Sequence, residues 1–462
     1  MEKGERMKTD MPIPESAGKV LQKLGEGGFE GFLVGGCVRD NLLGKAPKDY
    51  DVTTNARVAQ TKALFEGAEG FRVIETGVQH GTVTVLSDGV PIEVTTYRVD
   101  GAYSDGRHPD SVTFSDGIED DLSRRDFTIN AIAYSPAVGF VDLFGGAEDL
   151  EHGVIRCVGE PDKRFDEDAL RILRALRFAS VLGFGIEAAT AESIHRKKAL
   201  LSRLAKERVT AELFGLLGGE HAAEVLRNYS DVVAEVLPPV AAMFGCTQDN
   251  PYHIYDVWEH TLHVVDNVPP DRILRLAALL HDVGKPHCKT TDANGTGHFY
   301  GHGDIGATIC GKVFHKYLRT DKKTAERVTL LVKCHDEPIE PTRKIVHRRL
   351  AKYGKETLRQ LLALHRADVR GQSPAYLDRL AELDEAERIL EELLAENACI
   401  KINDLRIDGN DLLALGFERG PSLGETLHRL LDEVCEGSVR NEKAALKTRA
   451  MELLKEDGEN HH

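Results

Sequence analysis

Two aspartates separated by one residue, Asp49 and Asp51, are the first candidates for chemistry in this sequence. On a strand, side chains two positions apart project to the same face, about 7 Å apart at their Cα atoms. Such carboxylates repel each other unless a cation lies between them, and hard oxygen ligands suit Mg²⁺. Glu93, inside an apolar strand, is a third candidate if that strand pairs with the strand of Asp51. Three carboxylates around two metal ions are what in-line nucleotidyl transfer needs.

A pair of glycines, Gly35 and Gly36, precedes these aspartates, and Arg39 follows the pair closely. Glycines let backbone N–H groups approach a phosphate, and arginine offers a two-pronged donor to the same group. An isolated Asp-x-Asp sequence would more often be a solvated strand end. The neighbouring glycines and arginine favour a phosphate site instead.

The segment 167–178 predicts an amphipathic helix. Apolar residues cover one side of a helix drawn at about 100° per residue. Three guanidiniums on the other side repel one another unless anions lie among them, and a triphosphate is such an anion. A surface helix with Asp–Arg pairs is the alternative. The polar side carries Asp168, Arg171, Arg174 and Arg177.

Histidines and aspartates between 250 and 370 form a pattern typical of a metal site. Neutral imidazoles and carboxylates are ligands for transition metals such as Mn, Fe or Zn. A single helical histidine is more often packed in a core. An adjacent His–Asp pair after an apolar helix, with further histidines upstream and downstream, more often has a functional role. The candidates are His260, His281, Asp282, His302, His335 and Asp368.

The first 150 residues must position the aspartates, and they alternate apolar and polar residues with a period of two. This pattern predicts an α+β module on a small mixed sheet. A hairpin is expected across Ser87-Asp-Gly89. The expected strands are 32–34, 51–53, 81–86 and 91–97, with helices at 18–27 and 56–66.

From residue 166 onward the spacing of apolar residues becomes helical. We therefore expect a head, a helical neck, a metal-binding domain and a helical tail. Their expected bounds are 1–150, 151–245, 246–370 and 371–462.

Composition narrows the class of protein. The 462 residues carry a formal net charge of −16, which excludes a general nucleic-acid coat but allows a local basic lining. The eight cysteines are scattered without a CxxC pair, so a zinc ribbon is not expected. No apolar leader or membrane span is evident. We expect a cytoplasmic protein with reduced thiols and no membrane partner.

Three ordered motifs carry a family resemblance. They are Leu33-Val-Gly-Gly-Cys-Val-Arg-Asp-Asn-Leu-Leu-Gly44 with Lys48-Asp-Tyr-Asp-Val-Thr-Thr-Asn55, then Tyr97-Arg98 with Asp105-Gly-Arg-His-Pro-Asp110, and then Asp121-Leu-Ser-Arg-Arg-Asp-Phe-Thr-Ile-Asn-Ala131. Together they resemble class II CCA-adding tRNA nucleotidyltransferases and bacterial poly(A) polymerases. The resemblance implies a polymerase-β-like nucleotidyltransferase head.

The resemblance also implies roles for individual residues. Two Mg²⁺ ions would bind Asp49 and Asp51, while Gly36 and Arg39 would hold the triphosphate. Phosphate and ribose would contact Arg125 and Asp126. The stretch Asp100–Asp116 would be a flexible loop, and 206–213 would support the neck.

The arginine-rich segment resembles the family's fourth motif, a protein template for the base. Asp168 and Arg171 would then read the hydrogen-bonding edges of C and A. A carboxylate that only accepts and a guanidinium that only donates can complement the donors and acceptors of those edges. Arg174 and Arg177 would help to hold phosphates.

The histidine pattern resembles the HD phosphohydrolase superfamily. His260, His281, Asp282 and Asp368 match its core ligands, and His302 and His335 match the extra pair of two-metal versions. The resemblance implies a second, transition-metal site. Phosphoester hydrolysis and a purely supporting role both remain open.

We therefore expect addition of CMP, CMP and AMP from CTP and ATP to the tRNA 3′ end. The alternatives are a poly(A) polymerase, a CC- or A-adding specialist, and an HD phosphohydrolase with a nucleotide-binding head. Basic runs are candidate contacts for the tRNA backbone; they are 196–198, 343–355 and 440–449. The oligomeric state stays open.

Overall fold

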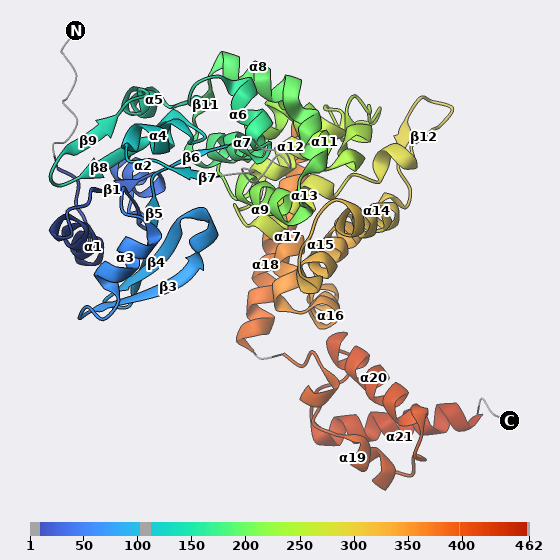
Figure 1. Ribbon diagram of the computed structural model, residues 1–462. Helices are drawn as coiled ribbons and strands as arrows, with labels where there is room; N and C mark the ends of the chain where they lie inside the picture. The colour runs from blue at the N-terminus through green and yellow to red at the C-terminus, as the bar shows by residue number, and fades with distance from the viewer. Residues whose placement is uncertain (1–9, 102–111, 397, 460–462) are drawn as a thin grey trace. The chain divides into compact units, whose positions relative to one another are not determined.

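The computed structural model describes residues 10–101, 112–396 and 398–459. The chain divides into two compact units, 1–238 and 239–462 (Figure 1). Each unit is described by itself below.

The first unit contains a seven-stranded mixed sheet in the order β3-β4-β5-β2-β1-β8-β9. β2 and β5 run parallel, and every other neighbouring pair in this sheet is antiparallel. The small mixed sheet expected from the sequence is thereby confirmed. Its strands are β1 (Gly31–Val34), β2 (Asp51–Thr54), β3 (Phe71–Gly77), β4 (Thr82–Ser87), β5 (Val90–Thr96), β8 (Ile132–Ser135) and β9 (Gly139–Asp142).

The expected hairpin is β4–β5. Asp88 and Gly89 connect the strands with φ values of 50° and 84°. Positive φ at both central residues defines the tight turn whose twist suits two antiparallel strands. Along β5, Ile92 and Val94 are buried while Glu93 between them is exposed. The alternation therefore turns Glu93 away from the core.

Helices of the first unit cover the sheet and continue beyond it. α1 packs on β1, β4 and β5, and α2 packs on β1 and β8. The helices expected at 18–27 and 56–66 are confirmed as α1 and α3, with shifted ends. The helices are α1 (Glu15–Glu26), α2 (Gly36–Leu42), α3 (Val58–Phe65), α4 (Ile118–Ser123), α5 (Gly146–His152), α6 (Pro161–Glu167), α7 (Leu170–Leu182), α8 (Ala188–Lys197), α9 (Lys206–Leu217), α10 (Ala222–Asn228) and α11 (Ser230–Val236).

Two shorter sheets complete the unit. β6 (Arg98–Asp100) pairs with β7 (Val112–Phe114), and β10 (Val154–Ile155) pairs with β11 (Gly185–Ile186). The β6–β7 pair frames the stretch expected to be a flexible loop, whose residues 102–111 lie outside the described residues.

One expected helix is divided. The segment 167–178 does not form a single helix, because α6 ends at Glu167 and α7 begins at Leu170. Asp168 between them has extended backbone angles, φ −142° and ψ 103°. Its Oδ1 accepts the N–H of Leu170 at 3.0 Å, a local bond that competes with continued helix.

Over the residues that the structure describes, the second unit is helical apart from the short hairpin β12 (Thr290–Thr291) and β13 (Gly297–His298). α12 packs on α17, and α14 packs on α15. The helices are α12 (Val257–Asn267), α13 (Arg272–Leu280), α14 (His302–Lys316), α15 (Lys322–Cys334), α16 (Arg343–Tyr353), α17 (Lys355–Gly371), α18 (Arg379–Ala395), α19 (Gly409–Ala414), α20 (Pro421–Cys435) and α21 (Lys443–Glu459).

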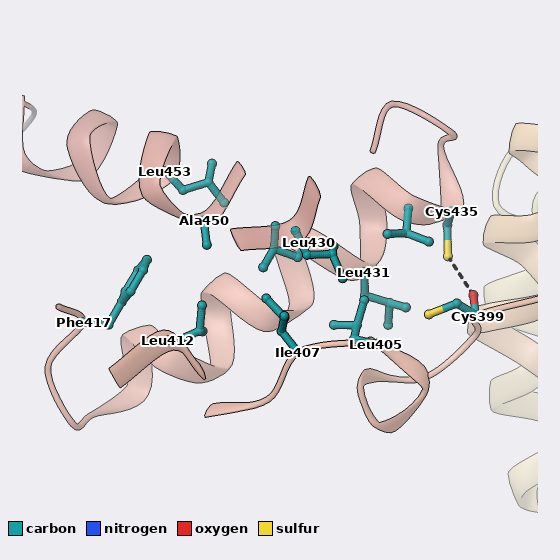
Figure 2. Close-up of a cluster of buried hydrophobic side chains, with 12 residues drawn as sticks. Cys399, Leu405, Ile407, Leu412, Phe417, Leu430, Leu431, Cys435, Ala450 and Leu453 are labelled. Carbon is teal, nitrogen blue, oxygen red and sulfur yellow. Dashed lines mark hydrogen bonds between the residues drawn. The ribbon is translucent and has the colours of Figure 1, made fainter. Parts of the chain in front are cut away.

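The last three helices share an apolar core of their own (Figure 2). Leu412, Leu430 and Leu453 are at most 1% exposed, which is full burial between α19, α20 and α21. The Cys435 thiol donates to the Cys399 carbonyl at 3.7 Å, so the preceding segment joins this core. Within the described residues, no helix is long and apolar enough to cross a membrane.

Candidate active site and metal-binding cluster

The parallel pairing of β2 and β5 sets Asp51 directly opposite Glu93, as expected. Asp49, in contrast, lies in the connection before β2 rather than on a strand, so the expected shared strand face is wrong for this residue. Asp51 is half-buried, and Asp49 and Glu93 are exposed. The three carboxylates do not form a compact set with ligand atoms all within 4.8 Å of one another.

Charge crowding at Asp51 is still pronounced. Burial, together with the neighbouring Glu93 and Asp49, raises the pKa of Asp51 to about 6 even though Arg125 opposes the shift. A carboxylate in such surroundings gains from a bound cation, which compensates both desolvation and repulsion. The donor set, all oxygen and partly exposed, fits a hard divalent ion.

The glycine pair lies beside two arginines. Gly35 has φ 78°, and a Cβ there would come 3.1 Å from Arg125 Nη1. Gly36 is close to Arg39, whose Nη2 would lie 3.8 Å from an added Cβ. The structure therefore brings together the expected phosphate-binding glycines, Arg39 and Arg125.

Two residues that the sequence analysis did not assign organise these arginines. Asp121 is fully buried and accepts from Arg124 at 2.6 Å and from Arg125 at 3.1 Å. Burial would raise the pKa of Asp121, but Arg125 and Arg124 outweigh it and hold that pKa below its usual range. Its spacing of three and four residues from the arginines is a signal readable in the sequence.

Asn130 is the second unassigned residue. Its Oδ1 accepts from Arg39 Nη1 at 2.8 Å, and its Nδ2 donates to Asp126 Oδ1 at 3.1 Å. The side chain thus connects two candidate nucleotide-binding residues that are far apart in the sequence, Arg39 and Asp126. No local sequence pattern marks this bridge.

Asp126 is buried against the arginine helix. Its Oδ2 accepts from Arg174 Nε at 2.8 Å and lies 2.6 Å from Arg174 Nη2. Burial would raise the pKa of Asp126, but Arg174 and Asn130 lower it to about 2. The aspartate is therefore ionised at neutral pH.

The remaining α7 arginines also have carboxylate partners. Arg171 Nη1 lies 2.8 Å from Glu167, and Arg171 also donates to the carbonyls of Arg164 and Arg124. Arg177 Nε donates to Glu212 at 2.6 Å. The anions among the guanidiniums are thus protein carboxylates. A triphosphate would have to compete with them.

In the second unit, the expected metal ligands converge from five elements. Two groups of three side chains have ligand atoms within 4.8 Å of one another, and Asp282 belongs to both. Asp368 joins the first group through its 2.9 Å approach to His260 Nε2. The groups are His260, His281 and Asp282, and Asp282, His302 and His335.

All four histidines are oriented in the same way. Each Nδ1 lies within hydrogen-bond distance of a backbone carbonyl, 2.7–3.1 Å away, and each Nε2 faces the cluster. An Nδ1–H donated to a carbonyl fixes the tautomer that leaves Nε2 free for a metal. The partners are Gly371 for His260, Ala278 for His281, Phe299 for His302 and Val332 for His335.

Asp282 is the central carboxylate of this cluster. It is buried, and neither oxygen has a hydrogen-bond partner among the residues that the structure describes, although Lys285 Nζ lies 2.7 Å from Oδ2. Buried carboxylate oxygens normally have partners. These observations fit a metal ligand, and the imidazole and carboxylate donors around it are typical of transition metals. A cavity of about 460 Å³ opens onto Asp282, His302, His335 and Asp368.

The basic runs are largely neutralised by neighbouring acids. Arg343 pairs with Glu396, and Arg449 pairs with Glu433. Lys352 also lies near an acid, Glu337. The local basic surface is therefore smaller than the sequence indicates.

Three family models match parts of the chain. The model described as Poly A polymerase head domain matches residues 31–156. An RNA and SrmB-binding site of polymerase A matches 183–233, and tRNA nucleotidyltransferase domain 2 matches 311–450.

Relatives match over nearly the whole chain. The CCA-adding enzyme of Leuconostoc mesenteroides is 34% identical over 94% of this chain and 95% of its own length. That of Pediococcus pentosaceus is 32% identical over 96% and 99%. The crystal structure of the Bacillus stearothermophilus CCA-adding enzyme in complex with CTP is similar with a TM-score of 0.69 and 29% identity, covering 96% of this chain and 98% of that one. The chain therefore belongs to the CCA-adding enzyme family.

Proposed function

We propose that this protein adds CMP, CMP and AMP from CTP and ATP to the 3′ end of tRNA and releases pyrophosphate. One observation carries the proposal: Asp51 and Glu93 lie side by side on parallel strands, and Arg125, whose charge acts on Asp51, lies next to Gly35 of the glycine pair. A carboxylate site for metal and a cradle for phosphate are thus adjacent.

The residues divide the work of the transfer. Asp49 and Asp51 would hold Mg²⁺, and Glu93 would assist them. When bound, Mg²⁺ supplies activation of the RNA 3′-hydroxyl and neutralises charge on the phosphates. Arg39 and Arg125 orient the triphosphate so that the 3′-oxygen attacks the α-phosphorus as the bond to pyrophosphate breaks.

Selection of the nucleotide is assigned to Asp168, which lies between α6 and α7, and to the arginines of α7 with their partner Asp126. Asp126 and Arg174 would position the ribose and phosphates, and Arg177 would bind phosphate beside them. Asp168 and Arg171 would read the base edge. Arg171 is buried and donates to Glu167 and to two backbone carbonyls, so reading the base requires it to exchange at least one of these partners.

Purified protein given tRNA that lacks CCA tests this function. Each labelled nucleoside triphosphate is offered singly, and then CTP and ATP together. We expect C, C and A to be added, followed by a stop. A long A tail would identify a poly(A) polymerase, and C or A alone would identify a specialist.

A second activity, phosphoester hydrolysis in the region 246–370, is favoured by one specific observation. Asp282 is shared by two groups of ligands whose histidines are all held by backbone carbonyls. We propose that His260, His281, Asp282 and Asp368 would hold one transition-metal ion and that Asp282, His302 and His335 would hold another. Phosphatase assays with added Mn²⁺, with and without chelator, test this activity.

The cellular location belongs to the same proposal. All eight cysteines are free. Free thiols, two of them partly exposed, suit a reducing compartment. We place the protein in the cytoplasm, with tRNA, CTP and ATP as partners.

A further inference from the structure

Helix α9 carries an arginine that binds the proposed base-reading carboxylate. Arg208 Nη2 lies 2.8 Å from Asp168 Oδ2, and Arg208 Nη1 lies 3.4 Å from Asp168 Oδ1. The guanidinium therefore faces the carboxylate with both prongs, the geometry that fixes orientation as well as distance. The two side chains are 23% and 18% exposed, so water screens the pair only in part.

Asp168 depends on such external support because it lies outside both neighbouring helices. Its bond to the Leu170 N–H restrains one oxygen. A single bond of this kind leaves the plane of the carboxylate free to turn. The fork of Arg208 defines that plane, and with it the direction of the remaining lone pairs.

Arg208 is itself placed by helix packing. One turn later on α9, Glu212 binds Arg177 of α7 at 2.6 Å. Gly215, on the same face, lies so close to α7 that an added Cβ would come 2.3 Å from Arg177 Cδ. Since α9 and α7 are joined at these points, the guanidinium of Arg208 sits at a fixed position relative to the start of α7.

We propose that Arg208 is a positioning residue for nucleotide selection, which holds Asp168 in the orientation that accepts the exocyclic amino group of cytosine or adenine. The inference rests on the proposed function, in which Asp168 reads the base. Uracil and guanine present a carbonyl oxygen where cytosine and adenine present an amino group. A carboxylate fixed in this orientation repels that oxygen, whereas one free to rotate turns away and loses the discrimination.

Primer-extension kinetics with CTP and UTP on tRNA lacking CCA test the inference. We expect Arg208→Gln to lower the ratio of kcat/KM for CTP over that for UTP by about tenfold or more. The CTP-over-UTP ratio of Arg208→Lys should lie between those of Arg208→Gln and the wild type, because lysine keeps the charge but lacks the two-pronged donor. The KM for tRNA should not change. Arg203→Gln, which removes an equal charge at a nearby exposed position, is the matched control and should keep the wild-type ratio.

A double-mutant comparison separates positioning from general damage. Asp168→Ala should lower the same ratio, and adding Arg208→Gln to it should lower the ratio no further, because both changes act through one carboxylate. Equal losses with CTP and UTP in Arg208→Gln would show a merely structural role and overturn the inference. So would a ratio within about twofold of wild type in both Arg208 variants.

Failure of the underlying function has a different signature. If Asp168→Ala leaves the CTP-over-UTP ratio unchanged, base reading by Asp168 is wrong and the role of Arg208 falls with it. Circular dichroism and the thermal unfolding midpoint accompany each variant. Where Arg208→Gln does not fold, Arg208→Lys decides, since a wild-type ratio in that folded variant counts against the inference.

Discussion

At the residue scale, Asp126 shows how buried charge is organised in the candidate nucleotide site. Its two oxygens bind Arg174 on one side and the Asn130 amide on the other. These partners outweigh the cost of burial, and its pKa falls from 3.8 to about 2. A carboxyl group with a lowered folded-state pKa stabilises the protein above its unfolded pKa and loses this contribution as the pH falls.

We therefore expect Asp126→Asn to destabilise the first unit by about 2 kcal/mol at pH 7, the equivalent of the shift in pKa. The difference in the free energy of unfolding between variant and wild type should be constant above pH 5. It should fade between about pH 4 and pH 2, where the wild-type carboxyl becomes protonated. Urea unfolding midpoints across this range measure it. A difference that stays the same down to pH 3 would contradict the assigned ion pair.

The aspartates before and on β2 give a second prediction at this scale. Asp49→Ala should abolish nucleotide addition, because Asp51 alone cannot hold two metal ions. The folded structure should persist, since Asp49 is exposed. Nucleotide incorporation at the wild-type rate would refute the assignment. Asp10→Ala, an exposed aspartate elsewhere in the first unit, is the control and should add nucleotides normally.

At the scale of elements, small residues decide how closely α14 approaches α15. Gly303 faces the Lys333 carbonyl, and an added Cβ would lie 2.6 Å from that oxygen. This close packing lets His302 Nε2 and His335 Nε2 come within 3.1 Å of each other. The same helix offers a neutral comparison at Gly311, where a Cβ would meet nothing within 4 Å.

We expect Gly303→Ala to lower the thermal unfolding midpoint and the amount of Mn²⁺ retained. The added methyl group would collide with the Lys333 carbonyl, and this backbone group cannot move aside as a flexible side chain can. Gly311→Ala should raise the midpoint slightly, since alanine favours helix by up to about 1 kcal/mol over glycine. Differential scanning calorimetry and metal analysis provide both readings. Equal midpoints in the two variants would show that the α14–α15 spacing adjusts freely.

At the scale of the whole molecule, the two proposed reactions lie on different compact units. The carboxylate and arginine site belongs to residues 1–238, and the histidine cluster belongs to 239–462. Each unit has its own buried core. The two chemistries should therefore be separable by mutation.

We predict that His281→Ala leaves CCA addition intact while it removes any metal-dependent phosphohydrolase activity. The reason is that His281 is a candidate metal ligand in the second unit, whereas the residues of the candidate nucleotide site belong to the first unit. Parallel assays of both activities on one preparation test this. Equal loss of both would show that the regions are not independent, provided that circular dichroism reports a folded variant.

Local chemistry made part of the fold readable from the sequence. Alternation around Asp88-Gly89 identified the β4–β5 hairpin because a two-residue turn and its strands are adjacent in the chain. Helix periodicity predicted the wrong structure between Glu167 and Leu170. There the Asp168 side chain accepts a hydrogen bond from the Leu170 N–H, and the helix is interrupted. Periodicity averages over a turn, so it does not detect a break made by one hydrogen bond.

The sequence by itself determined which residue types could do chemistry: paired carboxylates near glycines and an arginine, an arginine-rich segment, and a His–Asp series. Only the tertiary structure decided their partners. Three contacts join residues that are distant in the sequence. Asn130 connects Arg39 with Asp126, and Arg208 binds Asp168. Asp282 belongs to two groups of candidate metal ligands. Such contacts depend on how sheets and helices pack. The sequence of one segment does not predict which side chains of a distant segment will lie next to it.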